Sequence, residues 1–266
     1  SSLSVQAVAT LTNNSGAAYE DATLRLVAGT INQGPVGFRP EMMRTMAAKD
    51  AAAAAPVPSQ PVGDMHVYPI PRKTTLADRE TRQIVLFESA RVPVAREYRL
   101  VGNGGFHLRR VPEPVTVNAE RLLRFKNDEA AGLGVPMPSG TFRVYGGAGD
   151  AADTFLGADH IQHTAAGGEV VLDLGQAFDI TARRAQTDYR TQGLPKNASE
   201  SAHEIKLRNA SARAVTVKVV EHLPGDWEIL KSSQPFKKTA SDRAEWSIEI
   251  PANGERTLTY EARVQR

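Results

Sequence analysis

Two segments near the end of the chain alternate apolar and polar residues, and this alternation limits the possible folds more than any other feature. In residues 246–250 and 258–264 every second side chain is apolar. Successive side chains of a β-strand point to opposite faces, so each segment is predicted to be a strand with one buried and one exposed face. Asn253 and Gly254 readily adopt the positive φ angles of a type I′ turn, so we expect the two strands to form a β-hairpin. The buried face would hold Trp246, Ile248, Ile250, Leu258, Tyr260 and Val264, and the exposed face Ser247, Glu249, Thr259 and Arg263.

The same period of two recurs along the chain and predicts an all-β protein. A length of 266 residues fits two or three packed antiparallel β-sandwich units of immunoglobulin-like type. We expect an N-terminal β unit at 1–110, a middle β unit at 111–195 and a C-terminal immunoglobulin-like unit at 196–266. In the last of these, residues 221–229 have the strand, Pro-Gly turn, strand pattern of immunoglobulin-like sandwiches.

Residues 32–63 are predicted to form one long low-complexity insertion in the first unit. Helix-forming residues at its centre lead into an alanine run and a proline-rich end at 56–61. This composition favours a marginal helix or a mobile loop over a packed element. We expect the part from Met42 to Gln60 to be the most mobile of the chain.

A local theme recurs at three places: a strand ends in asparagine, a polar turn follows and a second strand begins. The three residues are Asn13, Asn127 and Asn209. Asparagine suits a strand end because its side chain can bond the backbone ahead and tolerates the left-handed region. The irregular spacing excludes a solenoid or a propeller. Asn13, Asn197 and Asn209 also begin Asn-x-Ser triplets, which matter as glycosylation acceptors only in a glycosylating host.

Composition excludes several classes of function. The net charge is +2, and the basic residues are scattered doublets without an aromatic platform between them, so no nucleic acid partner is predicted. The absence of cysteine removes disulfides, thiolate metal sites and a cysteine nucleophile. No apolar run reaches the roughly 20 residues of a membrane-spanning helix, and the first residues do not resemble a signal peptide. We therefore expect either a cytoplasmic protein or one whose leader was removed.

The densest set of metal-ligating residues is Asp159, His160 and His163. Residues three apart on a strand point to opposite faces, so the two histidines are predicted not to share an ion. Asp150, Asp153 and Asp159 could offer oxygens to calcium, but the alternating ligand spacing and central glycine of the familiar loop are absent. No metal site is assigned.

Residues 145–152 contain a G-x-G-x-x-A string after a strand, but the residues that follow lack helical periodicity. A dinucleotide-binding loop must open a helix, so a hairpin loop is the better interpretation. Trp227 and Trp246 could stack on sugars, although their place in alternating strands favours packing. The nucleophile elbow, zinc-protease and P-loop motifs are absent, and no catalytic, cofactor-binding or metal-binding residue is assigned.

Several blocks in a fixed order resemble a bacterial domain-of-unknown-function family of conserved hypothetical proteins, some of them labelled mucoidy-inhibitor-like. The blocks are residues 13–29, 133–145, 155–164, 174–179 and the strand pair at 246–264. The resemblance covers nearly the whole chain. It implies a β-rich structure, a cell-envelope context and further strands before the block that begins at Ser4, which would make this chain a fragment. It implies no established activity and no catalytic residue.

Three functions remain open at this point. The first is a non-catalytic β-sandwich that binds or scaffolds in the bacterial cell envelope, with an unknown envelope protein or glycan as partner. The second is an envelope hydrolase, acting on glycans, whose acidic residues are dispersed along the chain. The third is a self-assembling adhesion module that uses exposed strand edges. The expected location is periplasmic, secreted or envelope-associated, with the cytoplasm as the alternative, and the oligomeric state stays open.

Overall fold

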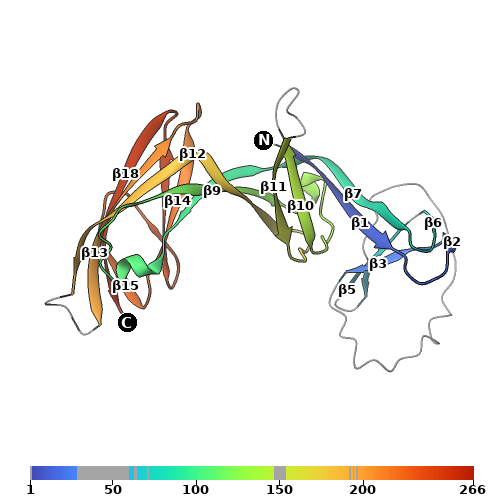
Figure 1. The fold of residues 1–266 in the computed structure, drawn as a ribbon, viewed down its shortest axis with the longest axis horizontal. Coiled ribbons are helices and arrows are strands. Elements are labelled where there is room, and N and C mark those ends of the chain that lie inside the picture. Colours follow the sequence, from blue (N-terminus) through green and yellow to red (C-terminus); the bar gives the residue numbers. More distant parts are fainter. Residues whose placement is uncertain are drawn as a thin grey trace. The chain divides into compact units, whose positions relative to one another are not determined.

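The computed structural model describes residues 2–28, 60–62, 65–70, 72–146, 154–191, 193, 195 and 197–266 (Figure 1). Over these ranges the chain is all-β, as predicted, and its helical residues are confined to two short 3₁₀ helices, η1 (Gly104–His107) and η2 (Glu129–Ala131). Within the same ranges no helix is long and apolar enough to cross a membrane. Most of the predicted insertion at 32–63, the segment from Met42 to Ser59, Asp150 and Asp153 lie outside the described residues.

The described chain forms two compact units, each assembled from separate stretches of sequence. The first comprises residues 1–94, 125–142 and 160–170, and the second comprises residues 95–124, 143–159 and 171–266. The division falls within β9 (Val115–Lys126), β10 (Gly140–Gly146), β11 (Thr154–Ile161) and β12 (Glu169–Arg190). The proposed domain boundaries near residues 110 and 195 stay predictions.

Small sheets make up the first unit. β1 (Ser2–Thr12) pairs antiparallel with β7 (Thr81–Pro93), and two bulges interrupt their register. Two further sheets are formed by short strands: β2 (Tyr19–Ala22) with β6 (Thr74–Leu76), and β3 (Arg25–Ala28) with β5 (Met65–Pro69) and β4 (Gln60–Val62). β10 and β11, which flank the glycine-rich string, pair in a two-stranded sheet that is divided between the two units, with most of both strands in the second.

A nine-stranded sheet makes up most of the second unit. Its strand order is β15-β18-β13-β12-β9-β8-β14-β17-β16. Its further members are β8 (Ala95–Val101), β13 (Ala198–Asn209), β14 (Val215–His222), β15 (Asp226–Ser232), β16 (Lys237–Ala240), β17 (Arg243–Ile250) and β18 (Gly254–Gln265). β8 and β14 are parallel, whereas β8 with β9 and β14 with β17 are antiparallel. The sheet is therefore mixed, and the expectation of purely antiparallel pairing is corrected at the junction of β8 and β14.

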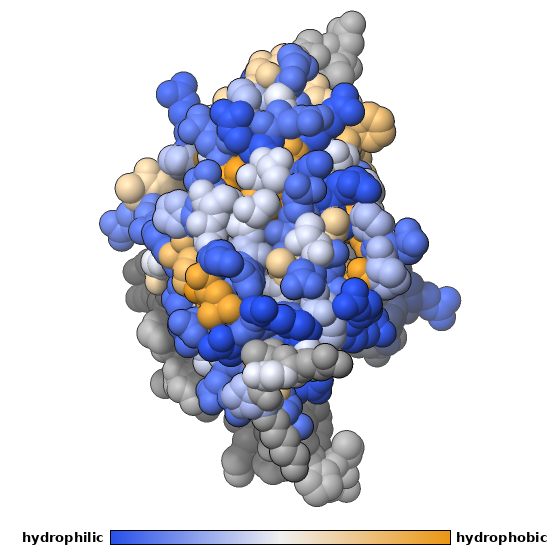
Figure 2. Space-filling view, turned by 90° about the vertical axis from the view of Figure 1, so that its left-hand side faces the viewer, coloured by the Kyte–Doolittle hydropathy of each residue, from blue (hydrophilic) through white to orange (hydrophobic). Residues whose placement is uncertain are grey.

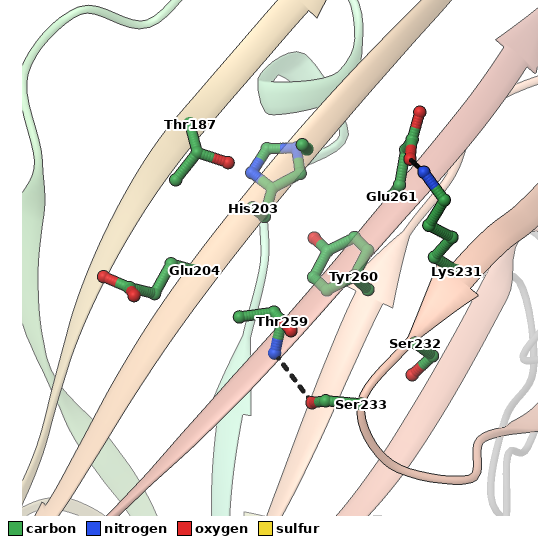
Figure 3. Close-up of a pocket in the computed structure, with 10 residues that line it drawn as sticks. Thr187, His203, Glu204, Lys231, Ser232, Ser233, Thr259, Tyr260 and Glu261 are labelled. Carbon is green, nitrogen blue, oxygen red and sulfur yellow. Dashed lines mark hydrogen bonds and ion pairs between the residues drawn. The ribbon is translucent and has the colours of Figure 1, made fainter.

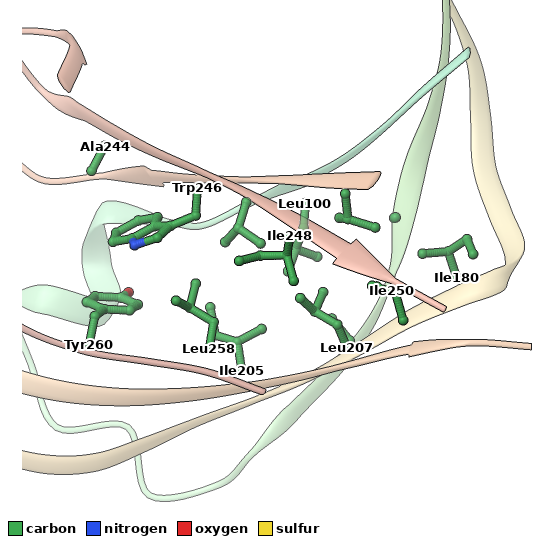
Figure 4. Packing of buried hydrophobic residues seen from close by; sticks show 14 of the residues in the cluster. Leu100, Ile180, Ile205, Leu207, Ala244, Trp246, Ile248, Ile250, Leu258 and Tyr260 are labelled. Atoms are coloured by element: carbon green, nitrogen blue, oxygen red, sulfur yellow. The ribbon is translucent and has the colours of Figure 1, made fainter. Parts of the chain in front are cut away.

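Side chains from two regions of this one sheet share the core of the second unit. Figure 4 shows Trp246, Ile248 and Ile250 of β17 facing Ile205 and Leu207 of β13 and Leu258 and Tyr260 of β18. All six side chains that alternation placed on the buried face are at most 5% exposed. The predicted strands and their faces are confirmed.

The predicted hairpin at the end of the chain is wrong. β17 pairs with β14 and β16, whereas β18 pairs with β13 and β15. In the connecting turn Asn253 has φ 50°, but Gly254 does not have the positive φ that type I′ geometry would require here. The turn instead carries the chain across the core, where the rings of Trp246 and Tyr260 stack 4.9 Å apart. Alternation determines which face is buried, and both arrangements bury the same face.

The two edge strands of the nine-stranded sheet, β15 and β16, follow one another in the chain. Two indole groups tie this region together: Trp227 donates from Nε1 to the carbonyl of Ser241 at 2.6 Å, and Trp246 donates from Nε1 to Ser232 Oγ at 2.9 Å. Trp246 is fully buried, and the ammonium of Lys238 lies 4.6 Å from the ring centre of Trp227. Both tryptophans therefore serve packing in this structure.

The recurring asparagines occupy equivalent structural positions. The Nδ2 group of Asn13 donates to the carbonyls of Ala17 (2.7 Å) and Ala77 (3.0 Å), and its Oδ1 accepts from the backbone and hydroxyl of Ser15. Asn209 repeats this pattern with the carbonyls of Arg213 (2.7 Å) and Pro251 (2.9 Å) and with Ser211. Asn127 donates to Val135 and Ala165 and accepts from the backbone of Gly134. Each side chain thus fastens a strand end to the turn of another strand.

The left-handed conformation expected of these asparagines lies elsewhere. None of the three asparagines has a positive φ angle. A residue with positive φ instead lies in the turn of the other strand that each asparagine contacts: Arg79 (61°), Gly167 (78°) and Asn253 (50°). Asn13 and Asn209 are at most 5% exposed and their amide groups are fully engaged. Two of the three Asn-x-Ser triplets are therefore structural in this fold.

Candidate functional site

The structure disperses the residues that the sequence singled out as possible ligands. β11 ends at Ile161, so His163 follows the strand and the parity argument does not apply to it. His163 Nδ1 accepts from the backbone of Ser139 at 3.1 Å, and Asp159 Oδ2 accepts from the backbone of Asp173 at 2.8 Å. In the described part of the chain, no three histidine or acidic residues are placed to hold a metal ion. The segment after the glycine-rich string is strand β11, which rules out the helix that a dinucleotide loop would need.

The strongest concentration of ionisable groups is instead buried in the second unit. We call it the buried cluster, and its members are His107, Arg184, His203, Glu221 and Tyr260. Each of them is at most 5% exposed. They come from η1, β12, β13, β14 and β18, so five elements of the chain meet there.

An ion pair forms the centre of the buried cluster. Arg184 on β12 holds Glu221 on β14 through two hydrogen bonds, one from Nη1 to Oε2 at 2.8 Å and one from Nη2 to Oε1. The guanidinium also lies over the ring of Phe106, 5.2 Å from its centre. Burial by itself would raise the pKa of Glu221, but the charge and the hydrogen bonds of Arg184, together with the nearby His107, lower that pKa to about 2. Glu221 is therefore a permanent anion in the core.

Gly102 makes room for this carboxylate. A Cβ atom at position 102 would lie 2.6 Å from Cδ and 2.8 Å from Oε1 of Glu221, closer than non-bonded atoms approach. The backbone of Gly102 donates to the carbonyl of Val220 at 2.7 Å, so the two chain segments are fixed side by side. A residue without a side chain is thus required next to Glu221.

His107 joins the ion pair to the segment around η1. Its Nε2 lies 3.6 Å from Glu221 Oε2, and its Nδ1 is 3.1 Å from Ser201 Oγ. Ser199 donates from Oγ to the carbonyl of His107 at 2.7 Å. The side chain and the backbone of His107 are therefore both held by β13.

His203 has no polar partner. Neither of its ring nitrogens makes a hydrogen bond, and its ring lies 4.8 Å from that of His107 and 5.0 Å from that of Tyr260. Burial, and then the neighbouring His107, lower the pKa of His203 to about 3. Burial and the negative charge of Glu221 raise the pKa of Tyr260. His203 and Tyr260 are therefore neutral at physiological pH, whereas Arg184 and Glu221 carry opposite charges.

The other face of the same strands carries a pocket of about 410 Å³ (Figure 3). Residues 202, 204, 259 and 261 alternate with the buried His203 and Tyr260, so they belong to the outer face of β13 and β18. Register shifts in the two flanking strands lie beside it, at Gln186/Asp188 in β12 and at Ile229/Lys231 in β15. Bulges of this kind bend a strand, which is consistent with a hollow here. The polar residues that line the pocket are Thr187, Glu204, Lys231, Ser232, Ser233, Thr259 and Glu261, together with His203 and Tyr260, which are themselves only 2% and 3% exposed.

Ion pairs cross the strands on this outer face. Glu200 on β13 accepts from Arg190 on β12 at 2.7 Å and from Arg263 on β18 at 2.7 Å. In the next row of β18, Glu261 binds Lys231 of β15 at 2.8 Å. Figure 2 shows the side of the molecule that is at the left of Figure 1, where most of the coloured surface is hydrophilic and the hydrophobic areas are separate. The character of the outer face itself follows from these ion pairs and from the residues of the pocket. The outer face therefore offers paired charges and hydroxyl groups to solvent.

Comparison of the chain with protein-family models, with curated proteins and with solved structures gave no match. The sequence did not predict the buried cluster, because its members are spread from His107 to Tyr260 and follow no local motif. One signal was present: Arg184 and Glu221 interrupt otherwise apolar positions of alternating strands.

Proposed function

We propose that this protein is a non-catalytic binding or scaffold protein of the bacterial cell envelope, built of immunoglobulin-like β-sandwich units. The observation that carries the proposal is the inaccessibility of the buried cluster. Arg184, Glu221 and the two histidines are the kinds of group that catalysis uses, yet they are at most 5% exposed and make contacts with one another. A reacting group must reach its substrate.

The outer face of β12, β13, β18 and β15 is the proposed binding surface. Three of these strands, β12, β13 and β18, are held by ladders on both sides and present their outward side chains rigidly, so little ordering entropy is lost when a partner binds. The pocket adds a concave area, and its hydroxyl groups and paired charges suit hydrogen bonding to a protein or a glycan. The envelope location rests on the family resemblance.

A pair of matched substitutions tests the proposal. Thr259→Arg fills the pocket, while Thr216→Arg places the same side chain on an exposed position of β14 in the same sheet. Protein immobilised and exposed to bacterial envelope extract is expected to retain a specific protein or glycan in the wild-type and Thr216→Arg forms and to lose it in Thr259→Arg. Equal retention by all three forms would remove the pocket from the binding surface.

One observation favours an envelope hydrolase as a second candidate. Glu204 and Glu261 occupy diagonal positions on β13 and β18 and line the same pocket. Diagonal neighbours are ~7–8 Å apart, within the range of the carboxylate pairs of inverting glycosidases. Both carboxylates already have a lysine partner, Lys206 at 3.3 Å and Lys231 at 2.8 Å. Turnover of a glycan that is lost in Glu204→Gln and in Glu261→Gln, with folding intact, would establish the hydrolase.

The adhesion alternative depends on free strand edges. The edge strands of the nine-stranded sheet carry Lys231 on β15 and Lys237 and Lys238 on β16. Lysine on an edge strand opposes pairing with another chain. A sedimentation series from low to high protein concentration is expected to show no self-association through these edges, and growth into polymers would favour the adhesion module.

A further inference from the structure

We propose that His203 is a proton-sensing residue whose protonation releases residues 103–111, the segment around η1, from the sheet and opens the buried cluster to water. The inference concerns regulation of the second unit. It does not depend on the proposed binding function.

In the closed structure a protonated His203 would have no hydrogen-bond acceptor for its ring nitrogens. The groups that face its ring come from every element around it: His107 from η1, Arg184 from β12, Glu221 from β14 and Tyr260 from β18. Arg184 is already positive, and Glu221 is already bound by two hydrogen bonds from that arginine. An imidazolium needs an acceptor at each nitrogen, and neither nitrogen has one. The charged form therefore requires water, which must enter by displacing an element.

Residues 103–111 are the element that yields most easily. β13, which carries His203, is held by backbone ladders to β12 and to β18. The η1 segment is held to the sheet mainly through single side chains. Ser199 binds the carbonyl of His107, Tyr189 binds that of Leu108, and Gln186 binds the carbonyls of Phe106 and Arg109 and the amide of Val111. Its separation breaks these contacts and leaves both ladders intact.

Proton linkage sets the size of the effect. The pKa of His203 is about 3 in the closed structure and would return towards its ordinary 6.5 in water. The open form therefore binds the proton more strongly, and the equilibrium constant for opening rises by about tenfold per pH unit below 6.5. Between pH 7 and pH 5 the expected rise is about 25-fold.

The chain has no cysteine, so single cysteines can report which part opens. Ser199→Cys places a thiol under the η1 segment, and Ala182→Cys places one in the core, where the residue is 1% exposed. Labelling with dithiodipyridine, expressed relative to free cysteine at each pH, is expected to rise about 25-fold at position 199 from pH 7 to pH 5. Labelling at position 182 is expected to stay unchanged over the same range.

Substitutions of histidine identify the sensor. His203→Phe keeps an aromatic ring beside Tyr260 and cannot take up a proton, and His203→Asn is a second variant in case the larger ring disturbs folding. Either is expected to abolish the rise at position 199, while His163→Gln, which alters a histidine of the first unit, leaves it in place. The proposal is overturned if position 199 shows no rise, if the rise survives both His203 substitutions, or if position 182 is labelled in parallel.

Discussion

Two glutamates of the second unit, Glu221 and Glu200, show how the same ion-pair chemistry differs between the two faces of one sheet. Both have almost no accessible surface, 0% and 2%, and both are bound by arginine. Glu221 lies in the core with Arg184, which is only 5% exposed. Glu200 lies on the outer face, and its partners Arg190 and Arg263 are 55% and 42% exposed.

The difference lies in the partner and its access to water. For Glu200, burial would raise the pKa, but hydrogen bonds from Arg263 and Arg190 lower it. Water can solvate either arginine if the carboxylate is removed, so the loss stays small. Arg184 is only 5% exposed, so removal of Glu221 leaves a buried, unpaired cation. Removing one member of such a buried pair is therefore strongly destabilising, although the intact pair need not be more stable than two apolar residues in its place.

The largest expected effect comes from breaking the interior pair. Glu221→Gln is expected to lower the free energy of unfolding of the second unit by about 3 to 5 kcal/mol, because Arg184 keeps its charge without a counter-ion. Denaturant titration followed by tryptophan fluorescence measures it, since both tryptophans of the chain belong to this unit. Combining Arg184→Met with Glu221→Leu is the control and is expected to recover most of the loss. A double variant as unstable as the single one would refute the argument.

The next largest loss of stability is expected from filling the space beside the Glu221 carboxylate. Gly102→Ala places a methyl group against the Glu221 carboxylate and is expected to lower the same free energy by about 1 to 3 kcal/mol through overpacking. Gly104→Ala is the matched control in the same unit, because a Cβ atom at position 104 would meet its nearest atom at 3.4 Å, an ordinary van der Waals contact. Equal stability of the two variants would show that Glu221 can move aside.

Features of the fold that depend on residues close together in the sequence could be predicted, whereas those that depend on distant residues could not. The faces of Trp246 and Tyr260 were predictable because alternation is local, and the asparagine corners were predictable because Asn209 and Ser211 are two residues apart. The pairing partners of β17 were not predictable, since a turn of four residues can join two paired strands or carry the chain across the core to other strands. The buried cluster was not predictable either. Arg184 and Glu221 are far apart in the sequence, and they meet because the parallel pairing of β8 with β14 brings distant strands together.

Low pH is expected to destabilise the second unit through the ionisable groups of its core. The unfolded chain binds a proton at His203 with the ordinary pKa of 6.5, whereas the folded pKa is about 3, so stability falls as the pH drops below 6.5. Glu221, with a pKa of about 2 against 4.5, adds a further fall only below pH 4.5. Between pH 7 and pH 5 we expect a loss of about 2 kcal/mol, most of it absent in His203→Phe. Denaturant titrations at pH 7, 6 and 5 provide the measurement, and an unchanged slope in His203→Phe would contradict the assignment.

The smallest expected effect is on the outer face. Glu200→Gln removes the shared partner of Arg190 and Arg263, but both guanidiniums remain hydrated, so the free energy of unfolding is expected to fall by at most about 1 kcal/mol. Salt screens exposed charges, so the difference between Glu200→Gln and wild type should shrink between 0.1 M and 1 M sodium chloride. The effect of Glu221→Gln should persist in the same salt series, because its partner is shielded from solvent. Equal losses of unfolding free energy in Glu200→Gln and Glu221→Gln, or equal salt dependence of the two losses, would contradict this comparison. The exposure of the arginine partner would then not determine how much a buried carboxylate contributes to stability.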